Sequence, residues 1–329
     1  MLVKNDAQIL TPKLNVYEGN VESVPTMKVN DPLLADAGIN LYVKREDMVH
    51  PHLSGNKYYK LKYNLEEAKN NGYDTLLTFG GAYSNHIYAT AAAGKIFKFK
   101  TIGIIRGEEH KILNPTLSFV KECGMKLCYM NRNTYRNKTS TDIVKLLEEE
   151  YGRFYLIPEG GSNALAVKGS TEIITSIKND FDFVCCAVGT GGTIAGLAAG
   201  LNGSRKVLGF SVLKGADFLN ERVRMLLKSY SGNELKNWQI NFNYHFGGYA
   251  KFDLNLINFI ENFTRRVNIP IEPIYTGKML YGIFDLVKDG FFSSGTKIIA
   301  IHTGGLQGLR GLSDKINRIK KDQKRLNLV

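Results

Sequence analysis

Cysteine is scarce in this chain of 329 residues, and its placement excludes two classes of site. The four cysteines, Cys123, Cys128, Cys185 and Cys186, show no CxxC spacing, so neither a zinc site nor a disulfide framework is indicated. Cys185 and Cys186 are adjacent in an apolar run, where successive strand side chains point to opposite faces. We therefore expect structural, buried thiols and no metal site.

Long apolar stretches are also lacking. The longest candidates, such as FVCCAV at 183–188, have the length of a strand and are too short to span a bilayer. The N-terminus shows no basic segment followed by an apolar one. We expect a cytoplasmic protein without a membrane partner.

Acidic residues are the minority among the charges, with 31 Asp and Glu against 43 Lys and Arg, a net charge of +12 and a pI near 9.3. Much of the excess lies in the C-terminal stretch KINRIKKDQKRLN and in scattered lysines, without nucleic-acid motifs or interleaved aromatic residues. The pattern favours a solvated basic surface that attracts small anionic substrates over nucleic-acid binding.

Short β-rich runs alternate with helical patterns along most of the chain. Apolar runs of this kind are typical of parallel strands joined by crossover helices, so the sequence predicts an α/β fold. The expected strands are 41–47, 75–79, 101–106, 126–130, 154–158, 181–188, 206–213 and 296–304. Helices are expected over 57–72, over 114–124 with Asn114 as cap and Pro115 in the first turn, and from Lys315 onward.

Ligands of open α/β sheets bind beyond the carboxyl ends of the strands, and four expected strands end in unusual loops. These loops are GGAYSNH at 80–86, EGGSN at 159–163, GTGGT at 189–193 and TGG at 303–305. In the third, glycines precede a helix of small residues, which suits a phosphate. The spacing is neither a dinucleotide fingerprint nor a Walker A loop. The glycines by themselves could serve only to permit tight turns.

Lys57, in SGNKYYKL at 54–61, stands where a loop turns into a helix. A lysine held at such a point could be a nucleophile toward carbonyls and form a Schiff base with pyridoxal phosphate. A solvated lysine at a helix start is the alternative. Ser84, Asn85 and His86 gather hydrogen-bonding groups at another helix start, where Asn85 could be no more than a cap.

Five motifs in order carry a family resemblance: SGNK followed by KL, then SNH, GTGGT, IYTGK and HTGG. Together they resemble pyridoxal-phosphate enzymes of the tryptophan synthase β type, and among these the family of D-cysteine desulfhydrase and 1-aminocyclopropane-1-carboxylate (ACC) deaminase. The match spans about residues 40 to 310. It implies a two-domain fold, with a large domain from 1–53 plus 162–329, a small inserted domain from 54–161, and a homodimer.

The resemblance implies a role for each motif residue. Lys57 would hold pyridoxal phosphate covalently with Asn56 beside it, and Asn85 would bond the cofactor ring hydroxyl. Ser84, Asn85 and His86 would line the site of the substrate carboxylate, and Ser84 and Tyr275 would act in catalysis alongside Lys57. The implied phosphate ligands are Lys60, Gly189, Thr190, Gly191, Gly192 and Thr193, and Thr276, Thr303 and Gly304 complete the cofactor site.

Two positions separate the activities within this family. ACC deaminases have glutamate at the position of Thr276 and leucine at that of Thr303, whereas D-cysteine desulfhydrases have threonine at both. A carboxylate would keep the pyridine nitrogen protonated more firmly than a hydroxyl does. The resemblance therefore implies β-elimination of D-cysteine or a similar small β-substituted amino acid to pyruvate, ammonia and sulfide. Either Lys57 or Tyr275 would remove the α-proton.

Departures from the family pattern border the substrate pocket. Tyr58 and Tyr59 replace small or basic residues, and Ala82-Tyr83 stands where glutamine often precedes the serine. Four alternatives stay open: an ACC deaminase, a synthase performing β-replacement, a protein that binds the cofactor without turnover, and a plain glycine-rich binding module.

Overall fold

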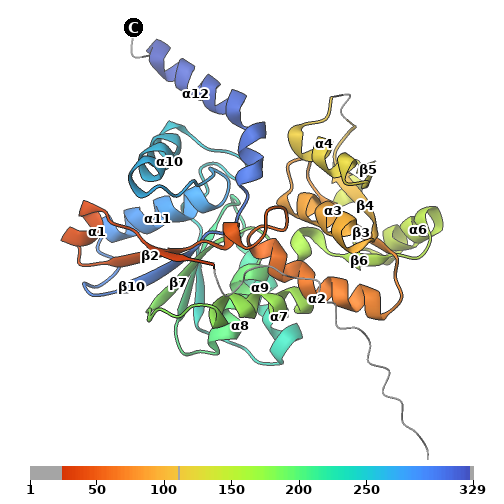
Figure 1. Ribbon diagram of the computed structural model, residues 1–329, viewed down its shortest axis with the longest axis horizontal. Helices are drawn as coiled ribbons and strands as arrows, with labels where there is room; N and C mark the ends of the chain where they lie inside the picture. Colours follow the sequence, from red (N-terminus) through yellow and green to blue (C-terminus); the bar gives the residue numbers. More distant parts are fainter. Residues whose placement is uncertain (1–23, 110–111, 327–329) are drawn as a thin grey trace, which may run out of the picture.

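The computed structural model describes residues 24–109 and 112–326. Its strands form two separate sheets, which lie in the two lobes seen in Figure 1. The large sheet has six strands in the order β1-β2-β10-β7-β8-β9, and only the β1–β2 pair is antiparallel. These strands are β1 (Thr26–Lys28), β2 (Asn40–Lys44), β7 (Phe183–Val188), β8 (Lys206–Ser211), β9 (Trp238–Asn241) and β10 (Lys297–Ile301).

The small sheet has four strands, all parallel, in the order β5-β4-β3-β6. Its strands are β3 (Thr75–Gly80), β4 (Lys100–Arg106), β5 (Lys126–Met130) and β6 (Tyr155–Ile157). Every side chain of β3 is buried, because this strand lies inside the sheet and helices cover both faces.

Helices cover both faces of each sheet. Against the large sheet, one face packs on α2 (Asn56–Asn70), α7 (Ala164–Thr175), α8 (Gly192–Leu201) and α9 (Phe218–Ser231), and the other on α1 (Pro32–Asp36), α10 (Leu254–Val267) and α11 (Thr276–Lys288). The small sheet is covered by α3 (Asn85–Phe97) and α4 (Pro115–Glu122) on one face, and by α5 (Arg132–Arg136) and α6 (Thr141–Tyr151) on the other.

The remaining elements are short or peripheral. Helix α12 (Ser313–Leu326) extends away from the body of the protein (Figure 1). Three 3₁₀ turns, η2 (Glu46–Met48), η3 (Glu159–Gly161) and η4 (Leu306–Gly311), follow strands β2, β6 and β10. The three turns therefore lie at the carboxyl ends of parallel strands, where ligands bind in such sheets.

The predicted α/β class and all eight predicted strands are confirmed, with ends that differ by a few residues. The sequence patterns missed β1 and β9, which are the two edge strands of the large sheet. The helix predicted from Lys57 begins at Asn56 and ends at Asn70, followed by Gly72 with a positive φ. Asn114 caps α4, as predicted, by accepting from the Leu117 N–H.

The cysteine prediction is right for one pair only. Cys185 and Cys186 are fully buried on opposite faces of β7. Cys123 and Cys128 are half-buried, because they lie at the end of α4 and on the edge strand β5. Within the described ranges, none of the helices is long and apolar enough to cross a membrane.

The contact between α2 and α7 brings two backbones unusually close. A Cβ atom added to Gly169 of α7 would lie 1.9 Å from the Tyr59 carbonyl oxygen of α2. No side chain fits there, so this glycine sets the spacing between the helix that begins with Asn56 and Lys57 and the helices of the large sheet.

Gly169→Ala tests this packing. Alanine normally stabilises a helix by about 1 kcal/mol relative to glycine. Here the helices must separate, and we expect a net loss of about 3 kcal/mol in the free energy of unfolding. Urea unfolding measures the change. Gly308→Ala in η4 is the matched control, because nothing lies within 4 Å of the added Cβ. Equal stability of both variants would contradict the close contact.

Candidate active site

A cavity of about 330 Å³ lies between the carboxyl ends of strands from both sheets. Loops after β3, β6, β7, β8 and β10 contribute to its lining, together with the start of α2, with α9, and with Tyr249 and Tyr275. Twelve of the predicted site residues line it: Asn56, Lys57, Lys60, Ser84, Asn85, His86, Gly189, Thr190, Gly191, Thr193, Tyr275 and Thr303. Gly192, Thr276 and Gly304 are not in the lining, but each is adjacent in sequence to a residue that is.

Lys57 projects into the cavity from the first turn of α2. Its Nζ atom donates to the Asn56 side-chain oxygen at 3.1 Å, and the Asn56 amide donates to the Thr193 hydroxyl at 2.7 Å. Surrounding protein excludes water from the amine, and this desolvation lowers the pKa of Lys57 to about 8. Far more of this lysine is neutral, and so nucleophilic, near neutral pH than of a surface lysine.

Lys60 lies one helical turn further on and is 2% exposed. Its Nζ atom donates to the Gly160 carbonyl and the Ser162 hydroxyl, both at 3.1 Å. These partners are neutral, and among the described residues Lys60 forms no ion pair. Burial, followed by the nearby charges of Lys57 and Arg222, depresses the pKa of Lys60 far below its usual value. An ammonium group buried among neutral partners is stabilised when an anion binds beside it.

The N-terminus of α8 faces the same point. The cap residue, Gly191, offers no side chain, so the first N–H groups of α8 lack a side-chain cap. A Cβ atom on Gly192 would lie 2.9 Å from the Lys60 Nζ atom, so the ammonium group lies directly against the helix start. The Thr190 hydroxyl bonds the Ser162 hydroxyl at 2.6 Å. The loop, the helix dipole and Lys60 together form an anion site.

Ser84, Asn85 and His86 lie together at the start of α3. The helix cap is Ser84, not Asn85: its hydroxyl oxygen accepts from the backbone N–H groups of His86 and Ile87. The Asn85 side-chain oxygen accepts from Gln307 at 2.9 Å. The buried His86 ring is bonded to the Thr78 hydroxyl at 2.8 Å, and its pKa is far below normal because of burial and then of Lys57 and Lys60. His86 is therefore neutral.

Tyr275 is paired with a second tyrosine that the sequence motifs did not reveal. The rings of Tyr249 and Tyr275 meet edge to face, with centroids 6.0 Å apart. Burial, followed by the neighbouring Tyr249, raises the pKa of Tyr275 well above its usual value, and desolvation raises the pKa of Tyr249. Both phenols therefore keep their protons at neutral pH.

Thr276 begins α11 and is fully buried. Its backbone N–H, with those of Ile274 and Tyr275, donates to the Glu272 carboxylate at 2.6–3.1 Å. The Thr276 hydroxyl oxygen has no hydrogen-bond partner among the described residues. An unpaired buried hydroxyl costs about 1–3 kcal/mol, which a polar ligand atom would recover.

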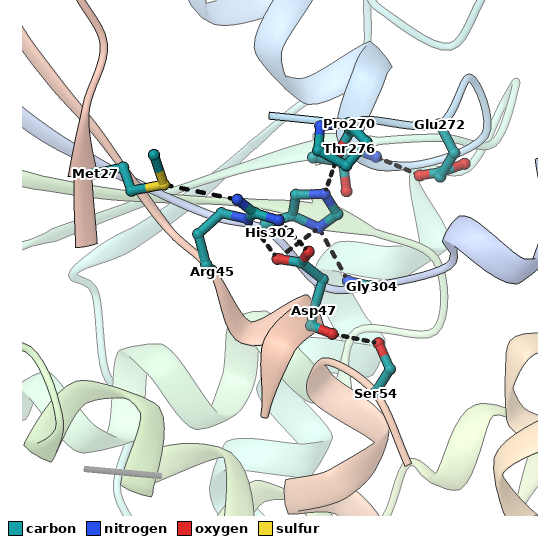
Figure 2. A network of polar contacts seen from close by, with 9 residues as sticks. All are labelled: Met27, Arg45, Asp47, Ser54, Pro270, Glu272, Thr276, His302 and Gly304. Atoms are coloured by element: carbon teal, nitrogen blue, oxygen red, sulfur yellow. Dashed lines mark hydrogen bonds and ion pairs between the residues drawn. The ribbon is translucent and has the colours of Figure 1, made fainter. Parts of the chain in front are cut away.

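A second layer of polar contacts joins three loops of the site (Figure 2). The fully buried His302 bonds the Pro270 carbonyl oxygen at 2.7 Å and accepts from the Gly304 N–H at 3.2 Å. The nitrogen that accepts from Gly304 lies 3.7 Å from Asp47, whose carboxylate accepts from the Nε and Nη2 atoms of Arg45. This network connects the segment before Lys57, the segment before Thr276, and Thr303.

Gly55 brings the first and last of these loops into direct contact. A Cβ atom there would lie 1.9 Å from the Thr303 carbonyl oxygen, and φ is +65°. Glycine is thus required at this position both by the backbone conformation and by the contact.

Comparison with known proteins now identifies the family. The family model described as "Pyridoxal-phosphate dependent enzyme" matches residues 24–304. The chain belongs to this family.

Individual members support the assignment. The chain is 31% identical to the bifunctional D-cysteine desulfhydrase/1-aminocyclopropane-1-carboxylate deaminase, mitochondrial, of Arabidopsis thaliana, over 88% of this chain and 78% of that protein. It is 26% identical to the D-cysteine desulfhydrase of Yersinia pestis, over 83% and 88% of the two chains. A crystal structure of an ACC deaminase homologue aligns with a TM-score of 0.79 at 29% identity and covers 90% of this chain and 93% of that one.

The residues of the cavity fit the family's cofactor, pyridoxal phosphate. Lys57 offers an amine of lowered pKa to the aldehyde, and Lys60 with the uncapped start of α8 offers a site for the phosphate. The unpaired Thr276 hydroxyl offers a partner for the ring nitrogen. Each of these groups lacks a charged partner within the described chain, and the cofactor has a complementary group for each.

Several residues in or beside the lining carry no motif signal. Gly160 lies in the lining and Ser162 beside it, and both accept from Lys60, while Tyr249 packs against Tyr275. The side chains of the two arginines of the lining, Arg106 and Arg222, show no ion pair or hydrogen bond within the described chain. The loop EGGSN at 159–163, which follows a strand, is the only sequence signal that points to Ser162.

The lowered pKa of Lys57 predicts its reactivity in the cofactor-free protein. Modification by an amine-directed reagent should rise with pH around a midpoint near 8, because only the neutral amine reacts. Mass spectrometry of the labelled peptide gives the midpoint. The exposed Lys69 of the same helix is the internal control for labelling. A midpoint for Lys57 at the ordinary value of a lysine would contradict its desolvation.

Proposed function

We propose that this enzyme catalyses β-elimination of D-cysteine, or of a similar small β-substituted amino acid, to pyruvate, ammonia and sulfide. The observation that carries the proposal is the fully buried Thr276 hydroxyl, which stands unpaired where the resemblance places the partner of the cofactor ring nitrogen. The nearby Glu272 carboxylate is occupied by three backbone N–H groups of the α11 start. The name of the Yersinia relative supports the same activity.

The charge of the cavity supports an amino-acid substrate. Its lining carries the cations Lys57, Lys60, Arg106 and Arg222 against the single carboxylate of Glu159. Glu159 is itself paired with Lys138 at 3.0 Å. Lys60 and the start of α8 would hold the cofactor phosphate at one end of this basic cavity. The substrate carboxylate would bind at the start of α3, beside Ser84 and Asn85.

Bound pyridoxal phosphate supplies an electron sink that weakens the bonds at the substrate α-carbon. Lys57 Nζ takes the α-proton: with a pKa near 8 it is neutral often enough to act as a base, and Asn56 holds it at the cavity. Tyr275 is a poor base, because burial and then the neighbouring Tyr249 raise its pKa.

The tyrosine pair serves the leaving group. Tyr249 lines the cavity beside Tyr275, and its hydroxyl would donate a hydrogen bond to the sulfur as charge develops there. The carbon–sulfur bond breaks with its electron pair on sulfur, which leaves as sulfide. Free 2-aminoacrylate then reacts with water to give pyruvate and ammonia.

ACC deamination is the second candidate. It is favoured by the name of the Arabidopsis relative, which carries both activities. Its weakness is the absence of a carboxylate at position 276, since ring opening demands a stronger electron sink than thiolate elimination.

We further propose that 54–161 form a small domain inserted into a large one from 1–53 and 162–329, and that the enzyme is a homodimer. The cytoplasmic location stays a prediction.

Pyruvate and sulfide release across a panel of D- and L-amino acids tests the proposed activity. We expect turnover of D-cysteine by the wild type, and none by Lys57→Ala, which also loses the borohydride-reducible cofactor. Lys69→Ala, an exposed lysine on the same helix, should retain both. If the wild type turned over only ACC, to 2-oxobutanoate and ammonia, the second candidate would replace the first.

The double variant Thr276→Glu, Thr303→Leu tests the choice between the two activities. A carboxylate at 276 would favour a protonated ring nitrogen, so D-cysteine turnover should fall by about tenfold or more and ACC turnover should rise. Pyruvate formation from D-cysteine and 2-oxobutanoate formation from ACC measure the two activities. Unchanged D-cysteine turnover would show that these positions do not govern the choice.

A further inference from the structure

The segment 245–251, between β9 and α10, carries Tyr249 into the cavity on a demanding backbone. Phe246 and Ala250 have φ values of 51° and 55°, which side-chain-bearing residues rarely adopt, and Gly247 and Gly248 also have positive φ. Such conformations persist only where surrounding contacts hold them. Tyr249 itself is 37% exposed, so its own packing contributes little of this restraint.

Lys278 supplies contacts that hold segment 245–251 in this conformation. Its Nζ atom donates to the carbonyl oxygens of His245 and Gly248, at 2.8 Å in each case. The side chain is fully buried on α11, yet it forms no ion pair among the described residues. The charges that act on it are those of Glu272 and Lys315. A buried ammonium that binds only backbone carbonyls is costly to maintain, and no role for it follows from the cavity, which it does not line.

Lys278 connects the two segments that carry Tyr249 and Tyr275. Gly248 directly precedes Tyr249, and the Met279 N–H, next to Lys278, donates to the Tyr275 carbonyl oxygen. The ammonium therefore joins the turn of α11 that begins at Tyr275 to the segment that carries Tyr249. We propose that Lys278 is a positioning residue, which fixes segment 245–251 against α11 so that the Tyr249 ring stays against Tyr275 and its hydroxyl faces the substrate.

A second lysine offers a comparison. Lys315 donates to the Ala250 carbonyl oxygen at 2.6 Å, but this contact is exposed, so water can replace the lysine. The Lys278 contact with Gly248 is buried and that with His245 is partly buried, so water replaces Lys278 less readily than Lys315. Lys278 is therefore the stronger restraint on the segment.

Amide hydrogen exchange on the cofactor-free protein tests the restraint itself. In Lys278→Met, which keeps the apolar stem and removes the donor, we expect the amides of 245–251 to exchange at least about tenfold faster. Lys278→Gln, whose amide can reach one carbonyl, should be intermediate and carries the test if the methionine variant does not fold. Lys288→Met, an exposed lysine at the end of α11, is the matched control. Unchanged exchange in both Lys278 variants would overturn the proposal.

The catalytic consequence rests on the proposed function and is tested by a double-mutant cycle. Lys278→Met should lower kcat by about tenfold or more in the wild-type background and by less than about twofold in the Tyr249→Phe background, because it acts through that hydroxyl. Equal losses in both backgrounds would show a merely structural role and overturn the positioning. If the wild type turned over no tested amino acid, the proposed function would fail while the exchange experiment still decided on the restraint.

Discussion

The desolvation of two lysine amines, Lys57 and Lys60, where the two sheets meet is the constraint on which the rest of the site depends. Taking a cation out of water is costly unless a partner repays it, and within the described chain neither amine faces a carboxylate. The same desolvation lowers both pKa values and directs the two amines to different chemistry. Lys57 becomes reactive, whereas Lys60 becomes half of an anion site with the start of α8.

Around Lys57 and Lys60, buried side chains hold the loops in place through hydrogen bonds to backbone atoms. The neutral His302 ring binds backbone groups on two loops, and Glu272 gathers three N–H groups at the start of α11. Lys278 holds two carbonyls of the segment that carries Tyr249. In each case a buried side chain satisfies backbone atoms that would otherwise be unpaired. The residues that face the cavity are thus held by others that never touch it.

The sequence predicted the α/β class, eight of the ten strands that the structure describes, and twelve lining residues, because these features are local. Glycine-rich turns and apolar runs of strand length can be recognised without knowing what they pack against. The edge strands β1 and β9 were missed, since short edge strands bury few side chains and leave a weak pattern. Ser162, Tyr249 and Lys278 were missed as well, because serine, tyrosine and lysine are common and acquire their roles only through distant partners.

By itself the sequence indicated the strands along the chain and the loops that end them. It also singled out Lys57, Lys60, Thr276 and Thr303 as candidate site residues. Only the tertiary structure decided that these loops meet at one cavity, that the Thr276 hydroxyl is left unpaired, and that Tyr249 reaches Tyr275. The physical reason is that burial and pairing are properties of neighbours in space. A side chain's pKa, or an unsatisfied hydrogen bond, exists only once residues distant in sequence have displaced water from around it.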